Sequence, residues 1–188
     1  MAHNPKTSPT EHVVAACIQG ERTAQFELYR RYRSVLFGIC LRYADSKATA
    51  EDLLQESFVQ IFSRLDQFRG DGSFEGWLRR IAVHTAAGHY RQRAKTLPLL
   101  ELTDLPDDSA PWTGPGDCAE AELLELIQRL PDGCRTVFNL YVVEGYSHRE
   151  IAELLGISDG ASRSQLAYAR KKLTTTLTAL AAPCHVPR

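Results

Sequence analysis

Apolar residues recur at spacings of three and four along most of this chain, which is the period of an amphipathic helix. We expect helices at about residues 11–19, 23–43, 47–68, 75–93 and 119–130, and a further helical group from residue 135 to residue 180. The expected helix at 23–43 would carry its apolar face on Phe26, Tyr29, Leu36, Ile39, Cys40 and Tyr43. The pattern therefore predicts an all-α fold.

The stretch from Ser147 to Lys172 has the pattern of a helix-turn-helix. Ser147 and Glu150 have the spacing of a capping box, and Gly156 can end a short helix by adopting a positive φ. Ser158 or Asp159 can then cap a second helix, whose N-terminal residues would lie at the base edges of the DNA major groove. The candidate base contacts are Ala161, Ser162, Arg163, Ser164 and Gln165, with Arg170, Lys171 and Lys172 placed near phosphates. The alternative is an ordinary pair of antiparallel helices.

Charge is distributed unevenly along a chain of 188 residues with a net charge of −1. Residues 76–100 contain five strong bases and no acid, whereas residues 96–126 contain eight acids and no base. The second segment is rich in Pro, Gly and Asp, so we expect two small helical domains joined by a flexible acidic linker. The expected divisions are a tail at 1–10, a domain at 11–95, the linker at 96–117, a four-helix helix-turn-helix domain at 118–182 and a tail at 183–188.

Targeting signals and cysteine motifs are missing from the sequence pattern. The N-terminal residues lack the apolar core of a signal peptide, and no apolar run reaches the length of a membrane span. The five cysteines are scattered without a CxxC pair, which favours a reduced cytoplasmic protein without a disulfide framework or a zinc ribbon. His84 and His89 lack acidic or cysteine neighbours at metal-ligand spacing, so we expect no cofactor.

Two helical surfaces in the first half are candidate binding sites. Asp52, Gln55 and Glu56 fall opposite the apolar side of the helix at 47–68, on a face that is either a partner site or merely solvated. The basic helix at 75–93 carries a second stripe of aromatic, cationic and small residues, preceded by a turn with an aromatic residue at each end. Such a stripe suits single-stranded nucleic acid, although Trp77 could also be a core residue. The residues of the stripe and turn are Phe68, Arg69, Phe74, Trp77, Arg80, His84, Gly88 and Arg91.

With these motifs in place, the chain resembles bacterial RNA polymerase sigma factors of the extracytoplasmic-function (ECF) group. The sequence DLLQESF at 52–58 is similar to the family's polymerase-docking motif, and FEGWLRRIAVHTA at 74–86 to its promoter-melting and minus-ten segment. The sequence at 130–158 is similar to the family's fourth region, and the linker stands where larger sigma factors have a third region. The resemblance implies a promoter-specificity subunit that is not an enzyme.

The resemblance also assigns partners and roles. Asp52, Gln55 and Glu56 would contact the clamp of the polymerase β′ subunit, and the stripe and turn would open and read the minus-ten element. The recognition helix would read minus-thirty-five DNA, and the β subunit and an anti-sigma factor are further implied partners. His84 and Gly88 replace an Asn and an Asp common in the family, so we expect an unusual minus-ten preference. Gln165 and Tyr168 replace two arginines of the recognition helix, so the minus-thirty-five sequence cannot be carried over.

Two other functions remain compatible with the residues alone. One is a free-standing helix-turn-helix regulator whose N-terminal domain senses a ligand or dimerises. The other is a helical anti-sigma-like interaction protein. The three hypotheses differ in what the first domain binds and in whether transcription depends on a promoter.

Overall fold

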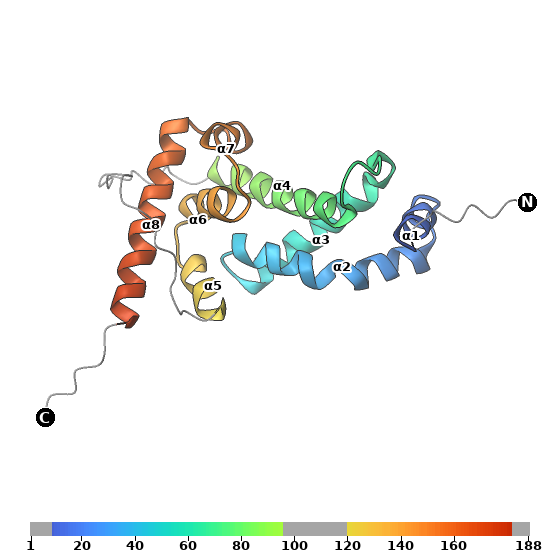
Figure 1. Cartoon of the computed structure of the whole chain (residues 1–188), viewed down its shortest axis with the longest axis horizontal. Coiled ribbons are helices and arrows are strands. Elements are labelled where there is room, and N and C mark those ends of the chain that lie inside the picture. The colour runs from blue at the N-terminus through green and yellow to red at the C-terminus, as the bar shows by residue number, and fades with distance from the viewer. Residues whose placement is uncertain (1–8, 96–119, 182–188) are drawn as a thin grey trace, which may run out of the picture. The chain divides into compact units, whose positions relative to one another are not determined.

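A computed structural model of the chain describes residues 9–95 and 120–181 (Figure 1). Every regular element within these residues is a helix, which confirms the predicted all-α class. The predicted linker and the C-terminal tail lie outside the described residues, as does the N-terminal tail up to residue 8. The first helix begins at Pro9, two residues earlier than expected.

The helices follow the predicted order closely. In the first half they are α1 (Pro9–Ile18), α2 (Arg22–Tyr43), α3 (Lys47–Ser63), the 3-10 turn η1 (Leu65–Gln67) and α4 (Phe74–Ala94). In the second half they are α5 (Glu120–Gln128), α6 (Asp132–Phe138), the π-helical turn η2 (Asn139–Val143), α7 (His148–Leu155) and α8 (Asp159–Ala181). The boundaries of α2 and α4 differ from the expected ones by one residue at most.

The chain divides into two compact units by its own contacts. The N-terminal unit comprises Met1–Cys40 and Lys47–Ala86, and the C-terminal unit comprises Leu41–Ser46 and Ala87–Arg188. Helices α2 and α4 each begin in the first unit and end in the second. The last turn of α2 and the last two turns of α4 therefore belong to the C-terminal unit.

The core of the N-terminal unit is built from apolar faces of all four helices. Leu36 and Ile39 from α2, Ile61 from α3 and Leu78 from α4 are essentially inaccessible to solvent. The prediction that Phe26 belongs to the buried face is wrong, because its side chain is 65% exposed. Ala24 and Leu28 take the buried positions at the start of α2, and this rotates Phe26 outward.

The C-terminal unit is centred on the packing of α6 and α7 against α8. Its fully buried side chains include Val137 and Leu140 beside Leu166 and Leu173. The helical group expected from residue 135 begins earlier, with α6 at Asp132, and it widens after Phe138 into the π-helical turn η2. In this turn the Glu144 amide donates to the Asn139 carbonyl at 3.0 Å, a five-residue step that replaces the α-helical four.

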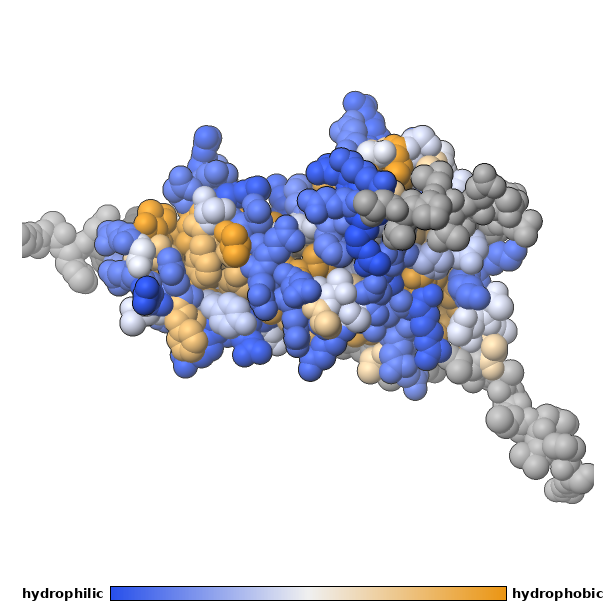
Figure 2. All heavy atoms as spheres, turned by 180° about the vertical axis from the view of Figure 1, so that it is seen from behind, coloured by the Kyte–Doolittle hydropathy of each residue, from blue (hydrophilic) through white to orange (hydrophobic). Residues whose placement is uncertain are grey.

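Hydrophilic side chains cover most of the face in Figure 2, with apolar patches among them. The large apolar side chains that are exposed among the described residues are Ile18, Phe26, Val35, Val59, Val142 and Val143. No helix in residues 9–95 or 120–181 is long and apolar enough to span a bilayer.

Candidate nucleic-acid interface

The polar side of α3 is exposed to solvent. Asp52, Gln55 and Glu56 are all exposed, and Val59 on the same side is 65% exposed. The opposite side of α3 is buried through Leu54, Phe58 and Ile61, as the spacing predicts. The structure thus brings the three predicted polymerase-binding residues together on one accessible acidic and apolar surface.

An aromatic cluster forms where η1, the following loop and the start of α4 meet. The ring of Phe68 lies 5.0 Å from that of Phe74 and 5.6 Å from that of Trp77, measured between centroids. Phe74 and Trp77 are stacked at 5.8 Å, and Tyr32 of α2 approaches Phe74 edge-on at 5.8 Å. Phe74 is only 8% exposed, so it holds the cluster in place, whereas Phe68 and Trp77 are half-buried and keep accessible surface.

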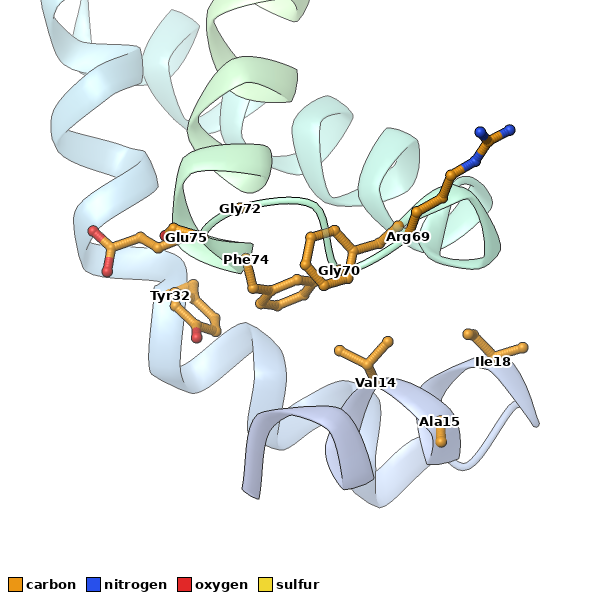
Figure 3. A pocket seen from close by; sticks show the side chains of 11 residues that line it. Val14, Ala15, Ile18, Tyr32, Arg69, Gly70, Gly72, Phe74 and Glu75 are labelled. Atoms are coloured by element: carbon orange, nitrogen blue, oxygen red, sulfur yellow. The ribbon is translucent and has the colours of Figure 1, made fainter. Parts of the chain in front are cut away.

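A pocket of about 550 Å³ opens beside this cluster (Figure 3). Val14, Ala15 and Ile18 of α1 form one wall, and the loop and helix start from Phe68 to Glu75 form the other, with Tyr32 beside them. In Figure 3 the guanidinium of Arg69 points away from the pocket into solvent, while Phe74 lies between Tyr32 and Val14. The volume lies within the range of ligand-binding pockets, and the lining is mixed apolar and polar.

The remaining minus-ten candidates continue along α4 from the aromatic cluster. Arg80, His84 and Arg91 are exposed, and Gly88 is half-buried with nothing within 4 Å of where a Cβ would stand. Protein packed around part of the His84 ring lowers the pKa of this otherwise exposed histidine, and the cations Arg80 and Arg64 lower it further. His84 is therefore a neutral hydrogen-bonding group near pH 7 beside two fixed positive charges.

The helix-turn-helix has the predicted local chemistry. The Glu150 amide donates to Ser147 Oγ at 3.3 Å, and Glu150 Oε2 accepts from the Ser147 amide at 2.8 Å, so the capping box is confirmed. Gly156 ends α7 at a φ of 71°, a left-handed conformation that a side chain would strain. Ser158 Oγ accepts from the Ala161 amide at 3.0 Å and starts α8. These three residues fix the turn between α7 and α8.

The predicted base-reading residues of α8 divide between its inner and outer sides. Arg163 is exposed and donates to Asp159 at 2.6 Å, and Ala161, Ser164 and Gln165 are half-buried. Ser162 is fully buried and hydrogen-bonds His148 Nδ1 at 2.9 Å, so it faces the interior of the helix-turn-helix and not the groove. Lys171 and Lys172 are exposed, whereas the Arg170 guanidinium lies 5.6 Å from the Tyr141 ring centroid.

Sequence reasoning missed a buried polar cluster in the C-terminal unit. Arg135 is only 2% exposed and donates to the carbonyl oxygens of Tyr43, Gln128 and Leu130 at 3.0, 2.7 and 3.2 Å. Its second amino group pairs with Asp132 at 2.6 Å. Burial lowers the pKa of the Arg135 guanidinium, and nearby Asp132 opposes that shift. The available sequence signal was an arginine among closely spaced apolar residues, which are Cys134, Val137, Phe138 and Leu140.

Within the described ranges no group of three His, Cys, Asp or Glu side chains is arranged to hold a metal ion. Cys17, Cys40 and Cys134 are buried cysteines that form no disulfide. Burial raises the pKa of the Cys134 thiol to about 12, which keeps it protonated and unreactive near neutral pH.

The described residues form an all-α protein that contains a helix-turn-helix, and comparison with known proteins identifies its family. The family model described as Sigma-70 region 2 matches residues 28–96, and that described as Sigma-70, region 4 matches residues 120–173. The chain belongs to the sigma-70 family of RNA polymerase sigma factors, in its ECF group.

Two relatives compared by sequence support this membership along nearly the whole chain. The chain is 30% identical over 179 residues to the RNA polymerase sigma-H factor of Pseudomonas aeruginosa, covering 89% of this chain and 93% of that protein. It is 29% identical over 169 residues to the ECF RNA polymerase sigma-E factor of Haemophilus influenzae, covering 82% and 88%. A solved sigma factor RpoE, in complex with the anti-sigma factor NepR from Bartonella quintana, is similar over 83% of this chain and 97% of its own, with 17% identity and a TM-score of 0.49.

Family membership decides between the functions left open by the residues. This protein is a sigma factor that directs promoter-specific transcription initiation, with core RNA polymerase and promoter DNA as its partners. The hypotheses of a free-standing regulator and of an anti-sigma-like protein are set aside on this ground. Sigma factors as a family are non-enzymatic initiation factors.

Proposed function

We propose that this sigma factor divides promoter opening and promoter reading among the surfaces described above. The face of Asp52, Gln55 and Glu56 docks on the β′ clamp of the polymerase. Phe68, Trp77 and the cationic stripe of α4 separate the minus-ten strands and hold one of them. The outer side of α8 reads the minus-thirty-five element through the major groove.

The observation that carries the proposal is the aromatic cluster at the pocket mouth, followed directly by cations along α4. Phe68 and Trp77 lie 5.6 Å apart between ring centroids and both retain accessible surface. Aromatic rings of this kind contribute about 1–3 kcal/mol for each base that stacks on them. The pocket of about 550 Å³ between α1 and the loop is an acceptor for a base that has left the duplex. Arg80 and Arg91 then attract the strand's phosphates.

The minus-thirty-five assignment rests on the side chains that α8 presents outward. Arg163 can pair bidentately with guanine and Gln165 with adenine, while Ala161 and Ser164 are small enough to let the backbone approach. Lys171 and Arg170 lie further along α8, where phosphates would pass. Ser162 was among the predicted base contacts. Because it hydrogen-bonds His148 of α7, its part in this proposal is to hold α8 in position and not to contact a base.

Domain boundaries, localisation and further partners follow from the same proposal. We assign residues 11–95 to docking and minus-ten reading and residues 118–182 to minus-thirty-five reading. The protein acts in the cytoplasm, where bacterial core polymerase works, and it catalyses no reaction of its own. An anti-sigma factor would be a further partner, as the RpoE structure from Bartonella quintana illustrates for a related protein.

Run-off transcription with purified core polymerase on a promoter library tests the proposal. The expected result is enrichment of templates that share a minus-ten and a minus-thirty-five sequence at a fixed spacing. Templates randomised in either element provide the matched control. If the chain does not associate with core polymerase, or if the free chain binds duplex DNA tightly in the absence of polymerase, the assignment of docking, strand opening and promoter reading to these surfaces is wrong.

A further inference from the structure

Tyr141 of η2 contacts both helices of the helix-turn-helix through its aromatic ring. The ring is stacked on that of His148, the first residue of α7, with centroids 4.5 Å apart and an interplanar angle of 24°. The Cζ atom of Arg170 on α8 lies 5.6 Å from the Tyr141 centroid, within the distance of about 6 Å at which a guanidinium is attracted to an aromatic ring. All three residues belong to the C-terminal unit.

The His148 ring is itself held in place from α8. Its Nδ1 atom lies 2.9 Å from Ser162 Oγ in a buried hydrogen bond, and only 7% of His148 is exposed. Arg170 stands eight positions after Ser162 on the same helix, so the contacts begin and end on α8 and pass through the two stacked rings. A ring stacked on a buried neighbour has little room to turn, and Tyr141 therefore presents a fixed surface to Arg170.

The π-helical turn η2 is the element that places this ring. In η2 the Glu144 amide donates to the Asn139 carbonyl at 3.0 Å. Turns of this kind are rare, and they occur frequently at functional sites. Tyr141 is half-buried within η2, whereas the two valines that follow it are exposed. The turn thus supplies α8 with an aromatic surface that a purely local reading of the helix pattern does not predict.

Arg170 lies on the side of α8 that carries Arg163. The two arginines are seven positions apart, which is nearly two helical turns, so they project in similar directions. Their separation along the helix axis is about 10 Å, from a rise of about 1.5 Å per residue, and the major groove of DNA is about 12 Å wide. When Arg163 reaches a base edge, Arg170 is consequently near the phosphates that border the groove.

The surroundings of Arg170 differ from those of the two lysines that follow it. Lys171 and Lys172 are exposed, whereas Arg170 is half-buried. An exposed lysine offers a mobile, strongly hydrated charge, and an arginine offers a planar group that can donate two parallel hydrogen bonds to a phosphate. A guanidinium that is already held on a ring loses less conformational freedom when it binds, which strengthens binding.

We propose that Tyr141 is a positioning residue for promoter binding, whose ring orients the Arg170 guanidinium toward a phosphate beside the minus-thirty-five major groove. The inference rests on the proposed function, because it takes α8 as the helix that enters this groove. Contacts to phosphates fix how a protein is placed on the duplex, and contacts to base edges read the sequence. Tyr141 therefore acts on the affinity for every sequence, whereas the choice of sequence stays with residues at the start of α8.

Substitutions of Tyr141 in purified holoenzyme test the proposal on duplexes that carry the minus-thirty-five element alone. Tyr141→Leu removes the ring and keeps an apolar side chain, while Tyr141→Phe removes only the hydroxyl and keeps the ring that Arg170 contacts. Tyr29→Leu is the matched control. Tyr29 is also half-buried, with Phe58 at 4.7 Å and Arg33 at 5.8 Å from its ring centroid, but it belongs to the N-terminal unit. Thermal denaturation verifies that each variant is folded.

We expect Tyr141→Leu to weaken holoenzyme binding about fivefold at physiological salt, on preferred and altered minus-thirty-five sequences alike. The slope of log affinity against log salt concentration should fall in magnitude by about one, as the loss of one phosphate contact predicts. Tyr141→Phe and Tyr29→Leu should retain the wild-type affinity and slope. Arg170→Gln should give the same loss as Tyr141→Leu, and the double variant should lose no more, because the ring acts through the arginine.

An unchanged salt slope in Tyr141→Leu, or a loss confined to the preferred sequence, would overturn the proposal. Binding by Tyr141→Phe as weak as that of Tyr141→Leu would do the same, as would additive losses in the double variant. If Tyr141→Leu does not fold, Arg170→Gln decides, because a wild-type salt slope in that variant excludes the phosphate contact. Wild-type holoenzyme without any preference for a minus-thirty-five sequence would instead show that the proposed function is wrong, whereas failure of this inference alone leaves that preference intact.

Discussion

The Arg135 Nε atom donates a hydrogen bond to the Tyr43 carbonyl at 3.0 Å, although 92 residues separate the two in the chain. The same guanidinium also reaches the carbonyls of Gln128 and Leu130 and the carboxylate of Asp132. One buried side chain thus satisfies the end of α2 and the end of α5. A planar group with five donors is suited to this task in a way that no other side chain is.

The first prediction concerns this arginine. Arg135→Met should lower the free energy of unfolding by about 3 kcal/mol, because three carbonyls, those of Tyr43 and Leu130 in buried hydrogen bonds and that of Gln128 in a part-buried one, lose this donor. Arg135→Lys should recover little, since an ammonium cannot reach carbonyls in several directions at once. Thermal or urea denaturation of the full chain measures both. Arg129→Met, at an exposed arginine of the same region, is the control and should change stability by less than about 0.5 kcal/mol.

The second prediction concerns the capping box of α7 and its dependence on pH. Hydrogen bonds from Ser147 hold the pKa of the Glu150 carboxyl below its ordinary value of 4.5. A carboxyl with a lowered pKa in the folded state stabilises the fold above pH 4.5, and this stabilisation is lost as the pH falls through the folded-state pKa. Glu150→Gln keeps the reciprocal hydrogen bond but cannot titrate.

Urea denaturation at several pH values checks this expectation. The difference in stability between wild type and Glu150→Gln should be constant at neutral pH and should shrink below pH 4.5. Ser147→Ala should lower stability by about 1 kcal/mol, as the loss of a serine N-cap does. A stability difference that grows on acidification would contradict the assigned cap. Glu153→Gln removes one charge from the same helix outside the cap and serves as the control.

Local chemistry made part of the fold predictable. The capping box at Ser147, the left-handed Gly156 and the exposed face around Asp52 depend on neighbours within about one helical turn, so the sequence pattern was sufficient. Phe26 was wrongly assigned to the buried face because the apolar residues at 24, 26 and 28 allow two alternative apolar faces on α2. One face includes Ala24 and Leu28 and the other includes Phe26, and only tertiary packing determines which of them is buried. The π-helical step after Phe138 has no comparable local signal.

The sequence was sufficient to predict which helix surfaces form the candidate site, but it was not sufficient to predict which side chains on those surfaces are exposed. Arg163 and Ser162 are adjacent on α8, yet one is exposed and the other is buried against His148. That difference depends on where α7 lies, which is a tertiary property. Likewise, the partners of Arg135 and Gln165 come from distant parts of the chain, so no local pattern could have named them.

The third prediction concerns the acidic face of α3. Asp52→Ala combined with Glu56→Ala should weaken binding to core polymerase about tenfold, because two exposed charges at the interface are lost. The melting temperature should stay unchanged, since both side chains are exposed. Glu21→Ala with Glu27→Ala removes the same charge from exposed positions elsewhere in the N-terminal unit. Equal polymerase affinity in the two double variants would remove the docking assignment.

The fourth prediction concerns sequence reading by Arg163. If it contacts a guanine, Arg163→Ala should cost roughly 1–3 kcal/mol of binding free energy on the preferred minus-thirty-five sequence and little on a sequence altered at that base pair. Holoenzyme binding to the two templates measures the difference. An equal loss on both templates would make Arg163 a phosphate contact instead. Arg129→Ala, which also removes an exposed arginine from an i,i+4 ion pair, should affect neither template.

The fifth prediction concerns strand opening by Trp77. Its ring stacks on Phe74 at 5.8 Å and remains half-buried, so Trp77→Ala removes a stacking surface for a base without emptying the core. Transcription from a duplex promoter should fall about tenfold, because one stacked base contributes on the order of 1–3 kcal/mol. On a template with a preformed bubble at the minus-ten element, strand separation is no longer required, and the variant should recover most of its activity. A variant equally impaired on both templates would indicate damage to the fold or to docking, and Trp77 would then lose its assigned part in melting.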